Sequence, residues 1–297
     1  WYFRHAVTPG YPNITVLQWL VCKYQETANA ENKFIRIHNL KFKINEDSGN
    51  KPRFYFHQNS CIRKRDSDSG SQYSTYVEEL SAYPQVIDQF EFRKNLVLQE
   101  LKSNGIPFAF DAIIGRGGLV KPIPGGVYEV NDAMKRDTLH AMRTHACNLG
   151  GLIADELSSS LPSCRAFIAD PGVVDELEDV ARITGSPLMP RITIWHALNQ
   201  KAIARRFAQE QHTQYENLDL IICHLGGGIS IAVHHRGRAI DANNALDGEG
   251  PFSPERAGTL PAGQLIDLCF SGQFTKDELK KRISGHAGLT AHLGTTD

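Results

Sequence analysis

Three apolar runs separated only by glycine turns constrain the second half of the chain most. Residues 218–223 form a short apolar run that leads directly into the turn His224-Leu225-Gly226-Gly227-Gly228. A strand pattern resumes at 229–233, turns at Arg236-Gly237 and continues at 239–242. Short apolar and β-branched runs bounded by glycine are typical of strands. The sequence therefore predicts the order strand, glycine turn, strand, strand.

Helical signals alternate with these strand signals along most of the chain. A 3.6-residue pattern predicts a helix over 86–103, and Asn131 is placed to cap a long helix. Residues 197–209 are also predicted to be helical, and residues 173–184 too. Two capping boxes, Thr75 with Glu78 and Thr275 with Glu278, mark further helix starts. The second of these helices should end near Gly285, and the apolar face expected after Asn131 comprises Met142, Ala146, Leu149, Ile153 and Leu157.

Two further strands are expected in the first half of the chain. Residues 108–114 are apolar and lie between Pro107 and the turn 115–118, and residues 166–169 end at Asp170-Pro171-Gly172. Residues 192–195 are expected to be extended. Strands that alternate with helices favour an α/β fold, and 297 residues suffice for two cores.

Charge and composition exclude several classes of protein. The chain has 32 basic and 33 acidic residues, so no overall field would attract nucleic acid or an anionic membrane. No apolar run approaches the roughly 20 residues needed to cross a bilayer, and the first 25 residues lack a secretory pattern. We therefore expect a cytoplasmic protein with no nucleic-acid or membrane partner. The six cysteines are scattered, and we expect reduced, mostly buried thiols.

Residues 1–72 differ from the rest, with polar clusters separated by short apolar stretches. The segment 63–72 has the composition of a loop or of a disordered linker.

Two features could carry chemistry. The glycines Gly226, Gly227 and Gly228 lie between two strands, so they are a plain hairpin turn or a cradle whose backbone N–H groups face a phosphate. Residues 243–260 are too rich in polar, glycine and proline residues for a core element, which predicts a long ordered loop. Within this loop, the guanidinium of Arg256 could hold a phosphoryl group or form a surface salt bridge.

The segment HLGGGISIAVHHRGRAIDANNALDGEGPFSPERAGTLP, residues 224–261, resembles the signature region of butyrate kinases. These enzymes belong to the acetate kinase branch of the actin-like and sugar kinase superfamily. The resemblance extends through IADPGV (168–173), FDAIIGRGGLVKPIPGGVYEVN (110–131) and VIDQFEFRK (86–94), and forward to the C-terminal end. It covers about three quarters of the chain, from about Tyr73 onward.

The resemblance implies a two-lobed α/β fold of duplicated ribonuclease-H-like architecture, incomplete at both ends, with ATP and acid meeting in a cleft. Residues 73–172 would form the first lobe, on the acid-pocket side. Residues 173–297 would form the second lobe, on the ATP-phosphate side. The family's opening phosphate turn and its adenosine-binding stretch have no counterpart here, which predicts a fragment. The segment 1–72 lies outside the resemblance.

The resemblance also implies roles for individual residues. His224 and the glycines Gly226, Gly227 and Gly228 would face the ATP phosphates. Arg256 would stabilise the transferring group, His196 would lie near it, and Asp170 would be linked to magnesium and catalysis. Arg116 would line the carboxylate pocket, where acetate kinases carry a histidine.

For several of these residues a structural role is the alternative. His196 would then be a capping or core histidine, and Asp170 would only initiate a turn. We interpret His234 and His235 as surface residues. Asp247 and Glu249 are given no role beyond loop structure.

The implied activity is reversible phosphoryl transfer between ATP and butyrate, with Mg²⁺ as the metal, by a phosphotransferase with a carboxyl acceptor. A short-chain carboxylate is the expected substrate, and a homo-oligomer is the expected assembly. Two alternatives stay open. The chain is a truncated or degenerate copy that catalyses nothing, or it is a branched-chain fatty acid kinase or an acetate kinase.

Overall fold

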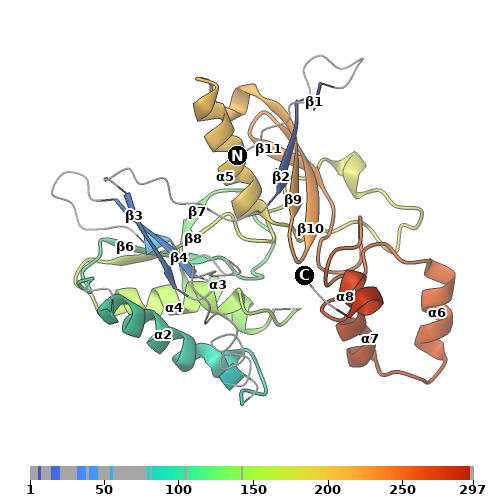
Figure 1. Ribbon diagram of the computed structural model, residues 1–297, viewed down its shortest axis with the longest axis horizontal. Coiled ribbons are helices and arrows are strands. Elements are labelled where there is room, and N and C mark those ends of the chain that lie inside the picture. Colours follow the sequence, from blue (N-terminus) through green and yellow to red (C-terminus); the bar gives the residue numbers. More distant parts are fainter. Residues whose placement is uncertain are drawn as a thin grey trace. The chain divides into compact units, whose positions relative to one another are not determined.

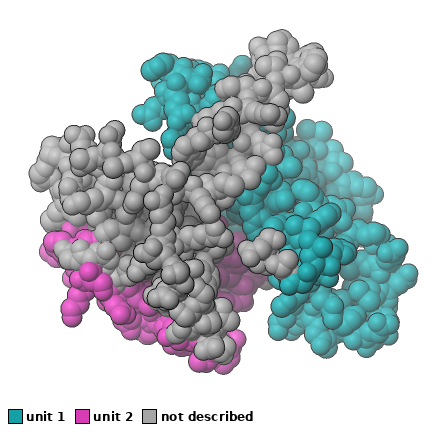
Figure 2. Space-filling model, viewed as in Figure 1, with its two compact units in different colours: residues 1–25, 122–125, 172–297 teal, residues 26–121, 126–171 magenta. Residues whose placement is uncertain are grey.

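The computed structural model describes residues 6–7, 15–20, 32–37, 40–45, 54–55, 79–80, 82–103, 106–141 and 143–294. These residues fall into two compact units (Figure 2). Unit 1 comprises residues 1–25, 122–125 and 172–297, and unit 2 comprises residues 26–121 and 126–171. The first capping box, Met142, the linker 63–72 and most of the segment 1–72 lie outside the described residues.

Unit 2 is built on a mixed sheet in the order β5-β6-β8-β7. Strand β6 (Ala112–Arg116) runs parallel to both β5 (Phe54–Tyr55) and β8 (Arg165–Ala169), and β7 (Val127–Glu129) is antiparallel to β8. A separate antiparallel pair is formed by β3 (Asn32–Ile37) and β4 (Leu40–Asn45). The strand at 166–169 is thus confirmed. The strand expected at 108–114 begins later, at Ala112, and continues through Gly115 and Arg116, where the sequence predicts a turn.

Helices α2, α3 and α4 belong to the same unit as this sheet (Figure 1). The predicted helix over 86–103 is present, but its first turn is the 3₁₀ helix η1 (Ile87–Gln89), followed by α2 (Phe90–Ser103). Asn131 caps α3 (Asp132–Leu139), and its side chain accepts a hydrogen bond from the backbone N of Met134. The apolar side chains of α2, β6, α4 (Asn148–Ser159) and β8 form one core together with Phe110, which precedes β6. The core includes Val97, Leu101, Ile113, Leu149, Ile153, Leu157 and Ala166.

The long helix predicted after Asn131 is wrong, because the chain divides it into α3 and α4. The buried side chain of Asn148 explains the restart. Its Oδ1 accepts from the backbone N of Leu119 at 3.0 Å, and its Nδ2 donates to the carbonyl of Arg143 at 3.1 Å. These hydrogen bonds fix the first turn of α4 independently of α3.

Glycines allow α4 to lie directly on β6. A Cβ at Gly150 would overlap the carbonyl oxygen of Arg116, and a Cβ at Gly115 would overlap the carbonyl oxygen of Gly150. Only hydrogen atoms in place of side chains permit this backbone contact. The position of Arg116 therefore depends on two glycines.

Unit 1 contains a five-stranded sheet in the order β1-β2-β9-β10-β11. Strands β9 (Asp219–Leu225), β10 (Ile229–His235) and β11 (Arg238–Ala242) form an antiparallel meander, which confirms the predicted order of strands. Strand β2 (Thr15–Leu20) runs parallel to β9 and pairs with β1 (Ala6–Val7). Arg236 and Gly237 both have positive φ, 47° and 81°, as the two central residues of a tight hairpin turn require.

Helix α5 (Ala197–Glu210) packs on this sheet and confirms the helix predicted at 197–209 (Figure 1). The core beneath it contains Ala204, Phe207, Ala208, Tyr215, Leu220 and Ile222. Tyr215 belongs to the 3₁₀ helix η3 (Tyr215–Asn217).

The helix predicted over 173–184 is wrong, since only a 3₁₀ turn, η2 (Asp179–Arg182), forms there. The backbone groups before it bond to distant segments. The carbonyl of Val174 accepts from Trp195 Nε1 at 2.8 Å, and the N–H of Glu178 donates to the carbonyl of Ile240 at 3.0 Å. Residues 192–195, which we expect to be extended, do not form a β-strand. Trp195 N nevertheless donates a hydrogen bond to the carbonyl of Gly172.

The C-terminal part of unit 1 holds α6 (Ala262–Phe270), α7 (Lys276–Ile283) and α8 (Gly288–Leu293). The predicted capping box of Thr275 and Glu278 is confirmed with both of its hydrogen bonds.

Of the four described cysteines, all free thiols, only Cys147 is buried, so the prediction of mostly buried cysteines is wrong for this set. No helix in the described part of the chain is long and apolar enough to span a membrane.

The contact between α4 and β6 predicts the effect of one substitution. Gly150→Ala should lower the free energy of unfolding by about 1–3 kcal/mol, the usual cost of overpacking, because backbone cannot move aside as a flexible side chain can. Thermal unfolding followed by circular dichroism measures the change. Gly263→Ala is the matched control, since Gly263 is also helical and a Cβ there meets nothing within 4 Å. Equal melting temperatures for the two variants would contradict the close contact.

Candidate active site

Two predicted site histidines lie face to face in unit 1. His196 is the N-cap residue of α5, and His224 lies near the end of β9. Their rings stack with centroids 3.7 Å apart and planes 9° from parallel. His196 Nδ1 is 2.8 Å from the hydroxyl of Ser230, and His224 Nδ1 is 2.8 Å from the side-chain amide of Asn199. Both rings are therefore fixed in position by their neighbours.

The triple-glycine turn joins β9 to β10 directly beside these histidines. Leu225 and Ile229 are register partners, so Gly226, Gly227 and Gly228 form the whole connection. The guanidinium of Arg256 lies against Gly228, where a Cβ would overlap its Nη1. The structure thus brings together four kinds of predicted site residue, namely His196, His224, the glycines and Arg256.

The loop that carries Arg256 is tied to the glycine turn. Ser253 donates its hydroxyl hydrogen to the carbonyl of Gly227 at 2.6 Å and accepts from the backbone N of Arg256 at 3.1 Å. Arg256 Nη1 donates to the carbonyl of Ala245 at 2.6 Å. The loop also bonds to the α7–α8 segment, where Ala257 N donates to the carbonyl of Ile283 at 2.9 Å. The prediction of a long ordered loop at 243–260 is confirmed.

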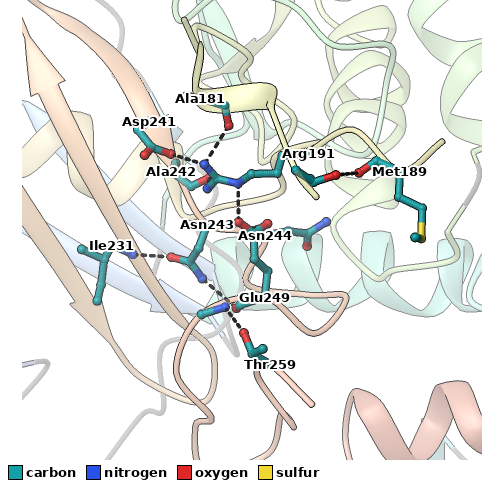
Figure 3. Close-up of polar contacts among 12 residues, drawn as sticks. Ala181, Met189, Arg191, Ile231, Asp241, Ala242, Asn243, Asn244, Glu249 and Thr259 are labelled. Atoms are coloured by element: carbon teal, nitrogen blue, oxygen red, sulfur yellow. Dashed lines mark hydrogen bonds and ion pairs between the residues drawn. The ribbon is translucent and has the colours of Figure 1, made fainter. Parts of the chain in front are cut away.

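Arg191 fixes the start of this loop (Figure 3). Its Nε donates to Glu249 at 2.6 Å, and its Nη1 lies 2.9 Å from Asp241. Glu249 in turn accepts from the backbone N of Asn244, and Asn243 bonds through its side chain to the backbone of Ile231 (Figure 3). Glu249 therefore has the structural role that we expected for it.

A buried polar group lies behind His196. His234 is fully buried, so its assignment to the surface is wrong. Its Nδ1 is 2.5 Å from the hydroxyl of Tyr215, and its Nε2 is 3.0 Å from Oε1 of Gln200. Gln200, which is also fully buried, donates a hydrogen bond from Nε2 to the hydroxyl of Ser230. His235 is only partly buried and pairs with Asp219 at 2.5 Å.

The next residue on α5, Lys201, forms a buried ion pair with Glu176 at 2.8 Å. The carboxylate of Glu176 also accepts from the backbone N of Gly125 at 2.8 Å and of Ala239 at 2.7 Å. Burial opposes the charge of Glu176, but the hydrogen bond and charge of Lys201, together with the backbone N–H groups of Ala239 and Gly125, outweigh burial and hold its pKa below the ordinary value.

Sequence reasoning did not single out Gln200, Lys201 or Glu176. The helical period contained a signal, because Gln200 and Lys201 share a face with Ala197, Ala204 and Phe207. Polar residues on the apolar face of a helix indicate a buried polar contact.

Unit 2 holds the remaining two predicted site residues at the carboxyl ends of neighbouring parallel strands. Arg116 ends β6 and is the register partner of Ala169, and Asp170 follows at the end of β8. Burial lowers the pKa of Arg116 from its ordinary value. Asp170 is buried, has a positive φ of 35°, and accepts from the backbone N of Gly126 at 2.8 Å. This edge is where α/β sheets usually bind ligands.

Metal-ligating side chains do not cluster in the described residues. Among residues 79–294, with the gaps given above, no group of three or more His, Cys, Asp or Glu side chains could hold a metal ion. The metal role of Asp170 therefore stays a prediction.

Comparison with known proteins gives relatives in sequence and in structure. Models of known protein families give no match. A protein of Bacteroides thetaiotaomicron named probable butyrate kinase is 89% identical over 221 residues, which are 74% of this chain and 63% of that protein. A probable butyrate kinase of Phocaeicola vulgatus is 56% identical over 74% of this chain and 62% of its own length. Butyrate kinase 2 of Clostridium acetobutylicum is 50% identical, with the same shares covered.

Solved structures similar to the chain are acetate and propionate kinases. The acetate kinase of Porphyromonas gingivalis superposes with a TM-score of 0.53 at 19% identity, over 63% of this chain and 50% of that one. A propionate kinase of Francisella tularensis gives a TM-score of 0.51 at 14% identity, over 96% of this chain and 71% of that one. At such low identity these likenesses show the fold alone.

The chain therefore has the α/β fold of the acetate and propionate kinases, which is an actin-like ATPase fold. About three quarters of it is homologous to the butyrate kinases, as the resemblance predicted. The chain spans about 62–63% of the length of the curated relatives it matches.

The buried histidine predicts how stability depends on pH. Burial lowers the pKa of His234 to about 3, and the charge of Lys201 adds to this effect. An unfolded histidine titrates near pH 6.5, so below that pH the unfolded state binds a proton that the folded state refuses. The free energy of unfolding should therefore fall as the pH is lowered from 6.5 to 5, by about 2 kcal/mol from this group.

Urea unfolding at a series of pH values measures this dependence. His234→Gln should be less stable at pH 7 and should lose this part of the slope. His235→Gln is the control, since it removes the neighbouring, partly exposed histidine and leaves His234 in place. An unchanged slope in His234→Gln would show that His234 takes up a proton in the folded chain at the same pH as in the unfolded chain, which contradicts the lowered pKa.

Proposed function

We propose that the protein to which this chain belongs is a butyrate kinase, a phosphotransferase that moves the phosphoryl group reversibly between ATP and butyrate. The observation that carries the proposal is the cluster of His196, His224, the triple-glycine turn and Arg256 in unit 1. It occurs in a chain that is 50–89% identical over 74% of its length to proteins named butyrate kinase.

The proposed reaction needs positioning and cations more than covalent help from the protein. A carboxylate oxygen of butyrate forms a bond to the γ-phosphorus of ATP while the bond from that phosphorus to the β–γ bridging oxygen breaks, which gives butyryl phosphate and ADP. Negative charge spreads over the equatorial oxygens in the transition state. Backbone N–H groups of a glycine turn and the guanidinium of an arginine stabilise such charge.

Within this proposal, residues 173–297 form the ATP-phosphate lobe. Gly226, Gly227 and Gly228 face the phosphates with their backbone N–H groups, and His224 supports the turn. Arg256 contacts the transferring group, and His196 lies near it. The contact of Arg256 with Gly228 supports this assignment, because it places the guanidinium beside the glycine backbone.

Residues 73–172 form the acid-pocket lobe in the same proposal. Arg116 binds the substrate carboxylate. Asp170 contacts Mg²⁺, which commonly takes one or two carboxylates together with substrate phosphates and water. A single buried aspartate at a strand end suits that mode of binding. ATP and Mg²⁺ are thus the proposed cofactors, and we further propose a cytoplasmic homo-oligomer.

The test is formation of acyl phosphate, trapped as the hydroxamate, from butyrate, ATP and Mg²⁺. Isothermal titration with ATP and Mg²⁺ accompanies it. We expect binding and butyryl hydroxamate. Binding without product, or no binding, would mean that this chain is a non-catalytic copy. Because one methylene changes discrimination by only about 1–3 kcal/mol, kcat/KM for acetate, butyrate and isobutyrate must also be compared. A higher value for acetate or isobutyrate would replace butyrate as the substrate.

Arg256→Ala should lower kcat by on the order of 10³-fold or more, the range typical of arginines that stabilise a transferring phosphoryl group. Arg256→Lys should recover part of the loss, because it keeps the charge but not the planar fork. Arg206→Ala is the matched control, an arginine of unit 1 that pairs with Glu210 one turn away on the surface of α5. The variants are assayed in this chain, or at the corresponding position of the Bacteroides relative if the chain is inactive. A kcat for Arg256→Ala within tenfold of the parent would remove the role.

A further inference from the structure

A continuous line of hydrogen bonds runs through unit 1 from Tyr215 to the site residue His196. It passes from the hydroxyl of Tyr215 to His234, then to Gln200, Ser230 and His196. The first four side chains belong to buried residues, each at most 3% exposed. Because the partners within the line are fixed, the direction of its hydrogen bonds can be worked out.

A backbone carbonyl fixes the orientation of Gln200. Its side-chain nitrogen Nε2 lies 3.0 Å from the carbonyl oxygen of Ser230. A carbonyl oxygen can only accept a hydrogen bond, so the atom facing it must be the amide nitrogen. The amide nitrogen therefore faces Ser230, and the amide oxygen faces His234. The two amide hydrogens are both used, one on the Ser230 carbonyl and one on the Ser230 hydroxyl at 2.8 Å.

This orientation decides where the hydrogen of the Ser230 hydroxyl goes. A hydroxyl has one hydrogen and two acceptor lone pairs. The hydroxyl of Ser230 accepts from Gln200 Nε2 at 2.8 Å and from the backbone N of His196 at 3.3 Å. Its single hydrogen is then donated to the third neighbour, Nδ1 of His196, at 2.8 Å. A hydrogen on Nδ1 would give the hydroxyl three donors for two lone pairs.

We infer that Ser230, oriented by Gln200, is a positioning residue that holds His196 as the neutral tautomer protonated on Nε2. The stack against His224 fixes the plane of the same ring. The consequence rests on the proposed function: His196 then presents an N–H donor, which suits an anionic phosphoryl oxygen. The opposite tautomer would present a lone pair at Nε2 and repel that oxygen.

The far end of the line has the same direction. Since the amide oxygen of Gln200 accepts from His234, the hydrogen of the neutral His234 ring is on Nε2, and Nδ1 accepts from the hydroxyl of Tyr215. Burial lowers the pKa of His234 to about 3, so this ring stays neutral at physiological pH. Every donor from Tyr215 onward thus points toward His196.

Histidine-ring ¹⁵N spectroscopy of the whole 297-residue chain tests the inference without any need for activity. Two-bond ¹H–¹⁵N correlations distinguish a protonated from an unprotonated ring nitrogen, and the His196→Gln variant assigns the signals by their loss. We expect His196 to show an unprotonated Nδ1 and a protonated Nε2 at pH 7.5. In Ser230→Ala the two tautomers should mix. A parent chain with Nδ1 protonated, or a Ser230→Ala spectrum identical to the parent's, would overturn the inference.

A buried serine elsewhere provides the matched control. Ser158 is 5% exposed in α4 of unit 2 and donates to the carbonyl of Asp155, so Ser158→Ala should leave the His196 signals unchanged. In the acyl phosphate assay, Ser230→Ala should lower kcat by about 10- to 100-fold, the range for groups that orient a site residue, with little change in KM. If no variant or parent forms acyl phosphate, the proposed function fails and the spectra still decide the tautomer. If the parent is active with Nδ1 protonated, only the inference fails.

Discussion

The buried ion pair between Lys201 and Glu176 is the interaction on which unit 1 depends. It joins α5, the segment before η2, the loop at Gly125 and the edge of β11, since Glu176 accepts from both Gly125 and Ala239. Neither charge would be tolerated alone in the interior, because an unpaired buried charge costs several kcal/mol. Their pairing holds α5 at a fixed position on the sheet. His196, the N-cap residue of α5, and Gln200, in the first turns of the helix, are thereby held in position as well.

Glycine sets how closely backbone segments approach in both units. In unit 2, Gly115 and Gly150 let α4 contact β6 directly, so the strand that ends at Arg116 has backbone rather than side chains above it. In unit 1, Gly228 leaves the space that the guanidinium of Arg256 fills. A glycine in each case removes a side chain beside a residue with a proposed role. Both the proposed chemistry and the packing therefore require a residue without a side chain at these positions.

Electrostatics and packing also meet in the buried line from Tyr215 to His196. Polar side chains are tolerated in a core when each donor has an acceptor. Here every hydrogen of the Gln200 amide and of the Ser230 hydroxyl has an acceptor. The same arrangement keeps His234 neutral and orders the ring of His196. The same hydrogen bonds therefore satisfy the buried polar groups of the core and orient the site residue His196.

The sequence by itself determined the α/β class, the meander around the glycine turn, α5, the second capping box and the long loop of Arg256, because local periodicity and turn chemistry specify them. It also determined the kinship with butyrate kinases. Only the tertiary structure decided that the helix after Asn131 divides, that 173–184 is mostly not helical, and that His234 is buried. In each of these the backbone or side chain bonds to a partner far along the chain, such as Leu119 for Asn148, Trp195 for Val174 and Tyr215 for His234. Local patterns carry no information about such partners, and their hydrogen bonds outweigh intrinsic propensity.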